Sequence, residues 1–247
     1  MLAVRLHQEG LKVERIETPS PRPGEVLVRV HAAAITRDEL EWLADRLPAI
    51  PSYEPSGVVV DTGEEVYALT PFDQDGVAAE YASVPSTVLA PKPARLSHTE
   101  AAALPMGGLS AWQALFTHGH LTRGERVLVT GASGGVGHIA VQLARHAGAQ
   151  VVQNGPADLV FDTAGGELPA GERIVTIAAE APGATYFVVE LNREQLLELG
   201  RLADAGELRP AIDSVFPLAQ AQAAFDRVAA RGKRGKVVLD IANASPG

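Results

Sequence analysis

Small residues crowd one short segment, GASGGVG, which lies between an apolar run, RVLVT, and a stretch with an apolar stripe at helical spacing. Such a turn lets the backbone approach a pyrophosphate, and the helix that follows offers free N–H groups and the positive end of its dipole. A turn that is glycine-rich only for packing is the alternative. The motif Ala-x-Gly-x-x-Gly predicts a dinucleotide site formed by Ala132, Ser133, Gly134, Gly135, Val136 and Gly137.

The segment that should recognise the ribose of that dinucleotide carries no charge. About 20 residues after the start of such a motif, an acidic side chain normally binds the ribose of NAD, or a basic one binds the 2′-phosphate of NADP. Here the corresponding strand ends in Gln153 and Asn154, and the next apolar run, DLVFDTAGG, follows almost at once. We expect NADP(H) or NAD(H) to bind without strong selection, or the cofactor site to have been lost.

Composition limits the chemistry and the partners. The 247 residues, 46% of them hydrophobic, suffice for one large domain or two small ones. A net charge of −9 argues against nucleic acid and membrane surfaces as partners. The absence of cysteine excludes thiol nucleophiles, disulfides and thiolate metal sites. No apolar leader or membrane-length run occurs, so we expect a cytoplasmic protein that acts on a small molecule.

Two patterns divide the chain. Residues 1–108 contain short runs rich in β-branched residues, such as EVLVRVHAAAI and SGVVVDTGEEVYAL, which predict a β-rich domain. Further along, strand-like apolar runs alternate with amphipathic helical ones, which predicts a parallel α/β sheet. Near the boundary, Ser97 and Glu100 have the spacing of a capping box and predict a helix start.

Several segments resemble the zinc-independent medium-chain dehydrogenase/reductase family, the quinone oxidoreductases and enoyl reductases. They are VRVHAAAIT, EAAALPMGGLSAWQALF, GERVLVTGASGGVGHIAVQLARHAGA, VFDTAGG and GKVVL. The resemblance implies an α/β protein with a GroES-like β-barrel domain, residues 1–108 and 208–247, and a Rossmann-like, doubly wound parallel sheet, residues 109–207. It also implies NADPH in the cleft, hydride transfer to a quinone or an α,β-unsaturated carbonyl, and a homodimer.

The resemblance also assigns site residues. Thr36 stands where the family has an Asn near the nicotinamide, and Ser110 where it has a Thr, although Ser110 could instead cap the helix AWQALF. Lys236 lies in the basic run ARGKRGK, which is either beside the cofactor phosphates or a solvated charge run. The candidate catalytic residues are Thr36, Asp38, Glu39 and Tyr53, with Asp38 or Glu39 as the acid or base. By the resemblance, Glu54 also lies in these cleft-lining segments. The candidate cofactor residues are Ser110, the glycine turn, Thr163, Ile177, Ala178 and Lys236.

No metal site is expected. Relatives with catalytic zinc use Cys and His ligands, whereas this chain has no Cys and carries Tyr53 in place of the His of a GHE motif. The one closely spaced histidine pair, His118 and His120, lies in the polar segment THGHLTRGE, where a solvated surface is the simpler interpretation.

The Rossmann-like part is shortened at two places. The helix and edge strand after AQVVQ are missing, and so is the helix between VFDTAGG and RIVTIAA. Loss of the edge strand is structurally tolerable but removes part of the adenosine site. The leading hypothesis is a zinc-independent NAD(P)H-dependent reductase. A cofactor-independent cyclase, isomerase or lyase of a natural-product pathway on the same scaffold is the second, and a non-catalytic partner of a full-length reductase is the third.

Overall fold

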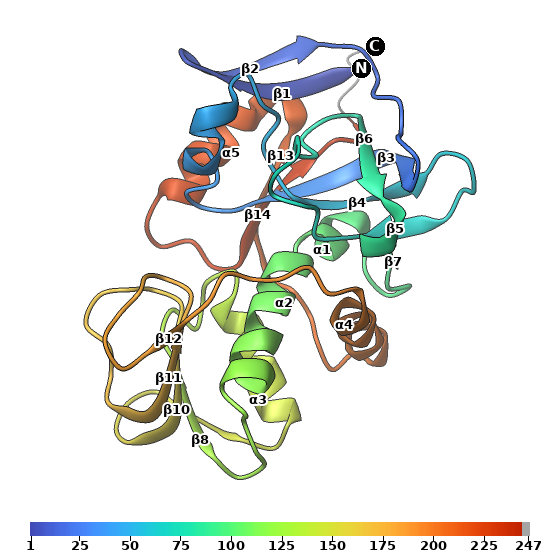
Figure 1. The fold of residues 1–247 in the computed structure, drawn as a ribbon. Helices are drawn as coiled ribbons and strands as arrows, with labels where there is room; N and C mark the ends of the chain where they lie inside the picture. The colour runs from blue at the N-terminus through green and yellow to red at the C-terminus, as the bar shows by residue number, and fades with distance from the viewer. Residues whose placement is uncertain (244–247) are drawn as a thin grey trace.

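The computed structural model describes residues 1–243, apart from the side chain of Ala44. It has two parts, which lie one above the other in Figure 1. The strands of the upper part are β1 (Leu2–His7), β2 (Gly10–Arg15), β3 (Glu25–Ile35), β4 (Glu54–Val59), β5 (Glu65–Tyr67), β6 (Tyr81–Pro85), β7 (Ala90–Pro91), β13 (Ile212–Pro217) and β14 (Lys236–Asp240). Those of the lower part are β8 (Arg126–Val129), β9 (Gln150–Val152), β10 (Ala157–Asp162), β11 (Gly171–Thr176) and β12 (Thr185–Tyr186).

Five α-helices and four short helical segments connect the strands in the described residues. The α-helices are α1 (His98–Ala102), α2 (Pro105–Trp112), α3 (Gly137–His146), α4 (Arg193–Ala205) and α5 (Ala221–Ala229). The short segments are η1 (Glu41–Arg46), η2 (Ser86–Val88), η3 (Gln113–His118) and η4 (Leu218–Gln220). Ser97 caps α1 in the predicted capping box with Glu100.

In the upper part, strands from the N-terminal part of the chain share one sheet with the C-terminal strands β13 and β14. Its strand order is β13-β14-β3-β4-β5-β7, with β6 also paired to β3. Strand β14 runs antiparallel to β3, so the return of the chain after α4 completes the N-terminal sheet. The expected barrel is not closed among residues 1–243, because β13 and β7 do not pair and β1 and β2 form a sheet of their own. Residues 244–247 of the predicted domain lie outside the described residues.

The lower part is a parallel sheet in the order β12-β11-β10-β8-β9. This is a Rossmann order in which the third strand, at the edge beyond β9, is missing, as the sequence predicted. Only residues 153–156 connect β9 to β10, although the segment must pass β8. Such a short crossing is possible because β9 is three residues long: the chain has to return only about 10 Å while moving sideways by two strand spacings of about 4.8 Å.

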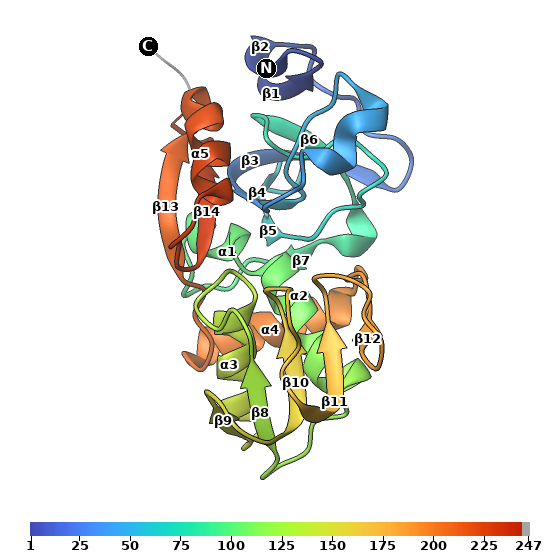
Figure 2. The same ribbon diagram turned by 90° about the vertical axis from the view of Figure 1, so that its left-hand side faces the viewer.

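Helices cover only one face of this sheet. Figure 2 shows α2, α3 and α4 behind β8, β10 and β11, while the near face carries loops alone. Val152, Leu128, Val160 and Ile174 form one row across four strands on that near face. The segments 153–156 and 163–170 cross this face in place of the missing helices. None of the helices within residues 1–243 is both long and apolar enough to traverse a bilayer.

Candidate active site

The glycine turn joins β8 to α3. Gly131 adopts a left-handed backbone (φ 63°), and its carbonyl oxygen accepts the N–H of Gly134 at 2.8 Å. A Cβ on Gly137 would collide with that same carbonyl oxygen, so Gly137 is needed to close the turn. At Gly134, by contrast, a Cβ would approach only the Gly131 oxygen, at 3.2 Å, and would otherwise face open space. Gly137 is therefore structural, whereas Gly134 leaves room for a ligand.

The turn also has backbone donors available. The N–H groups of Ser133 and Val136 find no hydrogen-bond acceptor within residues 1–243. Val136 precedes the first residue of α3 and has no side-chain cap. An anion at this place would meet free N–H groups and the positive end of the α3 dipole.

Lys236 is packed against this turn and does not project toward solvent. A Cβ on Gly135 would lie 2.8 Å from Cδ of Lys236, so the glycine makes room for the lysine stem. The preceding residue, Gly235, donates its N–H to the carbonyl oxygen of Ser133 at 3.0 Å. The start of β14 thus fastens the upper part to the glycine turn of the lower part.

The ammonium group of Lys236 ends in a buried polar cluster. It forms an ion pair with Oε1 of Glu54, and it donates to Oγ1 of Thr36 at 3.0 Å. The second carboxylate oxygen of Glu54 accepts the backbone N–H of Met106 at 2.9 Å and so caps the N-terminus of α2. Lys236 and Glu54 are buried, while Thr36 is only half-buried. Thr36 is therefore the member of this cluster that reaches the surface.

The buried carboxylate of Glu39 binds the backbone of Thr36 and Ser52. Its Oε2 accepts the N–H of Thr36 at 2.9 Å, and its Oε1 accepts the N–H of Ser52 at 3.1 Å. Burial raises the pKa of Glu39 to about 8, although the two backbone donors and nearby Lys236 act in the opposite direction. Because Glu39 is only 1% exposed, it meets the substrate side through Thr36 and not directly.

Asp38 and Tyr53 do not join this cluster in the structure. Asp38 is exposed and pairs with its neighbour Arg37, Oδ2 to Nε at 2.9 Å. The Tyr53 hydroxyl accepts from Arg46 at 3.1 Å, and its ring packs against Trp42 and Phe72. Both were predicted from their places in cleft segments, but the turn around Asp38 (φ 69°) directs that side chain outward, and aromatic packing holds Tyr53 inside.

The carboxyl end of the parallel sheet carries a second polar cluster around Asp162. Its carboxylate accepts the hydroxyl groups of Thr130 and Thr176, at 2.6 and 2.8 Å. Burial alone would raise the pKa of Asp162, but these bonds and the N–H groups of Ala164 and Gly165 lower it. The cluster orders the turns that carry three predicted cofactor residues, Thr163, Ile177 and Ala178.

Ser110 lies inside α2, in its sixth position, so the alternative prediction of a helix cap there is wrong. The capping function falls instead to Glu54, at the helix start. Ser110 is buried, 3% exposed.

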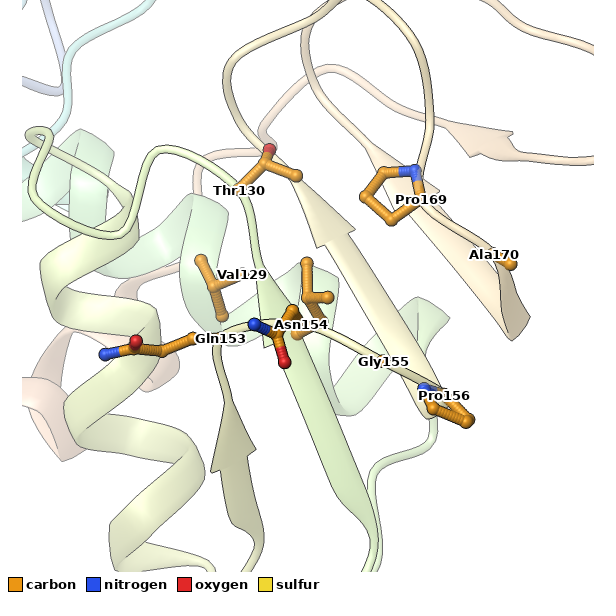
Figure 3. Close-up of a pocket in the computed structure, with 9 residues that line it drawn as sticks. Val129, Thr130, Gln153, Asn154, Gly155, Pro156, Pro169 and Ala170 are labelled. Carbon is orange, nitrogen blue, oxygen red and sulfur yellow. The ribbon is translucent and has the colours of Figure 1, made fainter.

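A hollow of about 670 Å³ opens on the loop-covered face of the parallel sheet (Figure 3). Gln153 and Asn154 project at its edge, where β9 ends, and Thr130 lies at the end of β8. No charged side chain is among the described residues that line it, which are Leu128, Val129, Thr130, Gln153, Asn154, Gly155, Pro156, Pro169 and Ala170. The hollow offers amide and hydroxyl groups to a ligand but no charge.

Two residues that form the site, Met106 and Asp162, were not predicted from the sequence. Glu54 was placed in a cleft-lining segment by the resemblance, but it was not named as a catalytic or cofactor residue. Asp162 had a signal in the sequence, because it ends an apolar strand of a parallel sheet, where ligand-side turns begin. Met106 takes part in the site only through its backbone N–H, which binds Glu54, and through its sulfur, which lies 3.3 Å from the Thr36 hydroxyl. No sequence pattern predicts these two contacts.

Known proteins match nearly the whole chain. Residues 22–74 match the alcohol dehydrogenase GroES-like domain, and residues 135–239 match a zinc-binding dehydrogenase domain. A probable zinc-binding oxidoreductase, mitochondrial, from Arthroderma benhamiae is 30% identical and is covered over 93% of its length by 94% of this chain. The NADPH-dependent alkenal/one oxidoreductase, chloroplastic, from Arabidopsis thaliana is 28% identical, with 93% of this chain covering 75% of it.

A solved structure gives the same result. The quinone oxidoreductase from Thermus thermophilus, solved also in complex with NADPH, is 31% identical and superimposes with a TM-score of 0.79 over 98% of this chain and 100% of that one. The alignment to the Arthroderma protein spans 308 positions, more than the 247 residues here, so that relative carries residues that this chain lacks. With its GroES-like and Rossmann-like parts, the chain belongs to the medium-chain dehydrogenase/reductase family.

Proposed function

We propose that this protein is a zinc-independent, NAD(P)H-dependent reductase of α,β-unsaturated carbonyl compounds or quinones. The observation that carries the proposal is the position of Lys236, which touches Gly135 of the glycine turn with its stem and Thr36 with its ammonium group. A dinucleotide bound at the glycine turn would therefore lie next to Lys236 and Thr36, the residues that we expect to face the substrate. The names of the alkenal/one and quinone oxidoreductase relatives support the same substrate class.

The residues present fit a nicotinamide dinucleotide. Ser133 and Val136 would bind the pyrophosphate through their N–H groups, and the open space beside Gly134 would admit it. Gln153 and Asn154, at the hollow next to the turn, would meet the adenosine half. When bound, the reduced cofactor supplies a hydride.

Zinc independence rests on the donor set. The Tyr53 hydroxyl accepts a hydrogen bond from Arg46. The ammonium group of Lys236 contacts both Thr36 and Glu54. Thiolate ligands are excluded by the sequence, which has no cysteine. A cation already paired with Glu54 disfavours a second one at the same place.

One observation favours a second candidate, a cofactor-independent cyclase, isomerase or lyase. The four-residue connection between β9 and β10 removes the edge strand that helps form an adenosine site. In that case the glycine turn would serve packing, and the chemistry would lie with Thr36 and its neighbours.

Replacing Gly134 distinguishes the two candidates. The variant Gly134→Val should abolish NADPH and NADH binding in a reductase, because branched carbons would occupy the open space where the pyrophosphate approaches. Gly134→Ala is the matched control for loss of glycine and should retain part of the binding. Binding is followed by fluorescence titration and calorimetry, after circular dichroism has shown that each variant folds. Protein that converts a substrate equally well with and without Gly134→Val, and without added cofactor, would support the second candidate.

We also propose a homodimer and a cytoplasmic location. Strand β12 ends the parallel sheet with one free edge among the described strands, and Tyr186 and Val188 are exposed beside it. Unpaired edges of this kind favour pairing between copies. Sedimentation equilibrium tests the dimer, and fractionation of the source cells tests the location.

A further inference from the structure

We propose that Lys236 is a positioning residue for the Thr36 hydroxyl, and that Thr36 donates a hydrogen bond to the carbonyl oxygen of the substrate. The inference rests on the proposed reductase function and names two residues that act in it. It follows from how hydrogen-bond donors and acceptors are distributed around a single hydroxyl group.

The hydroxyl of Thr36 has one proton and can accept from other groups. Lys236 has only protons to give, so the 3.0 Å contact between Nζ and Oγ1 makes the threonine oxygen an acceptor there. The Thr36 proton must then point elsewhere. The groups near it in the structure are Oε1 of Glu54, at 3.3 Å, and the sulfur of Met106, also at 3.3 Å. The first is long for an O–H···O bond and the second is a weak acceptor, so a better acceptor on the open side would take the proton.

Lys236 is itself held firmly. The Glu54 carboxylate anchors its ammonium group, and Glu54 is in turn fixed by the N–H of Met106. The lysine stem is packed against Gly135, and the backbone N–H of Lys236 donates to the carbonyl oxygen of Ala211 at 2.9 Å. A charge fixed in this way polarises the Thr36 hydroxyl and does not have to reorganise during reaction.

With the reduced cofactor bound, a hydride would add to the conjugated carbon of the substrate, the C=C electrons would move toward the carbonyl group, and negative charge would develop on the carbonyl oxygen. Thr36 stabilises that charge by a hydrogen bond and keeps its own proton. Water would then supply the proton that completes the reduction, and the cofactor would be left oxidised. A quinone would accept the hydride in the same way, with the negative charge on a carbonyl oxygen, and uptake of one proton from water followed by tautomerisation would give the hydroquinone.

The test is a double-mutant cycle on kcat with Thr36→Val and Lys236→Met, assayed with NADPH against trans-2-hexenal and 1,4-benzoquinone. T36V should lower kcat about 100-fold, the effect of removing one donor to a developing oxyanion. K236M should lower it about 10-fold, with KM and the NADPH dissociation constant nearly unchanged. The two together should be no worse than T36V alone, because the lysine acts through the threonine.

A matched control and a second variant distinguish a loss of catalysis from a loss of folding. The side chain of Lys92 is likewise only 7% exposed and is paired with a glutamate, Glu65. Its other hydrogen bonds go to the carbonyl oxygens of Pro93 and Leu96, so Lys92→Met should leave kcat unchanged in folded protein. Where K236M does not fold, because Glu54 is left unpaired, K236M/E54Q removes both charges and enters the same cycle.

The outcomes separate this inference from the proposed function. Wild-type protein that reduces either compound, but in which T36V and K236M multiply to about 1,000-fold, would overturn the role of Lys236 and leave the reductase intact. Wild-type protein that binds no NADPH and reduces neither compound would overturn the proposed function itself.

Discussion

His138 forms a hydrogen bond with Gly134 through one ring nitrogen and with Ala211, the residue before β13, through the other. Its Nδ1 lies 2.6 Å from the carbonyl oxygen of Gly134, and its Nε2 lies 2.8 Å from the backbone N of Ala211. Since the amide of Ala211 can only donate, Nε2 must be the unprotonated nitrogen and Nδ1 must carry the proton. The structure thus requires a neutral His138, and burial lowers its pKa from the usual value.

Loss of this bridge should destabilise the protein and loosen the turn. We expect His138→Ala to lower the free energy of unfolding by about 1–3 kcal/mol, the sum of two ordinary hydrogen bonds, and to weaken NADPH binding. His146→Ala, on the exposed end of α3, is the control and should do neither. Urea unfolding and fluorescence titration measure the two effects; equal behaviour of the two variants would contradict the argument.

His138 also makes stability depend on acidity. Its folded pKa is lower than its unfolded pKa, so its contribution is complete above the unfolded value of about 6.5 and is lost as the pH falls below that. The melting temperature of the wild type should therefore increase relative to that of His138→Ala as the pH is raised from 5 to 7.5. A difference between the two proteins that stays constant over this range would show that His138 does not contribute to the pH dependence.

Glu39 should act in the opposite direction. Burial raises its pKa to about 8, from 4.5. A carboxyl group with a raised folded pKa contributes stability below its unfolded pKa, and that contribution is lost as the pH rises through about 8. We expect Glu39→Gln to be less stable than the wild type near pH 4.5, and the difference in stability between the two proteins to narrow as the pH rises from 4.5 to 8. Thermal unfolding of both proteins across that range is the measurement, and a difference that widens with rising pH would refute the prediction.

Cofactor selection should be weak. The hollow beside the glycine turn has Gln153 and Asn154 at its edge and no charged lining among the described residues (Figure 3). Each charge-assisted bond contributes about 1.5–3 kcal/mol, so its absence removes one to two decades of selectivity. Asn154→Arg should therefore shift the preference toward NADPH, and Asn154→Asp toward NADH, each about 10-fold in Kd. A wild-type preference above about 1,000-fold for either cofactor would contradict this account.

Local patterns in the sequence predicted much of the fold. The strand-turn-helix around Gly131, the missing edge strand after Val152 and the capping box at Ser97 each depend on residues near one another in the chain. The resemblance to a known family supplied the grouping of β13 and β14 with the N-terminal strands. The open strand order of the upper sheet differs from the closed barrel expected, because closure depends on pairing between strands distant in sequence.

The site was predictable only in part. Thr36 and Glu39 were predicted as catalytic residues and lie in contact with each other, but Lys236 was expected beside the cofactor phosphates or in a solvated charge run, whereas its ammonium group is paired with Glu54. Those two residues are 182 positions apart, and a basic run such as ARGKRGK gives no sign of which member turns inward. The backbone conformation at Asp38 could not be predicted from the sequence either, because no residue pattern indicates the positive φ that turns this side chain outward.

Zinc should be absent from the purified protein. The expectation follows from the lack of cysteine and from the lysine beside Thr36. Elemental analysis after dialysis should give well under one zinc per chain, and a chelator should leave activity unchanged. Stoichiometric zinc that survives chelation, with loss of turnover on its removal, would be the contrary result.

Asp213 should be needed to hold the segment that leads into Lys236. Its carboxylate forms two bonds with Arg227 of α5, at 2.7 and 2.6 Å, and accepts the backbone N–H of Arg234 at 2.8 Å. The Arg227 guanidinium is the main cause that lowers the pKa of Asp213 to about 2. Its contribution to stability is therefore present above the unfolded pKa of about 4 and is lost as the pH falls toward 2.

We expect Asp213→Asn to lower the free energy of unfolding at pH 7 by about 2 kcal/mol, since it weakens bonds to a charged partner. The difference from wild type should shrink as the pH is lowered from about 4 toward 2, because the carboxyl group of unfolded wild-type protein takes up a proton in this range before that of the folded protein does. Asp226→Asn is the matched control: Asp226 is exposed on the same helix, α5, and should cost little. Since Arg234 is two residues before Lys236, D213N should also lower kcat through the Thr36 contact, and a variant with full kcat at 25 °C would show that β14 holds Lys236 without help from Asp213.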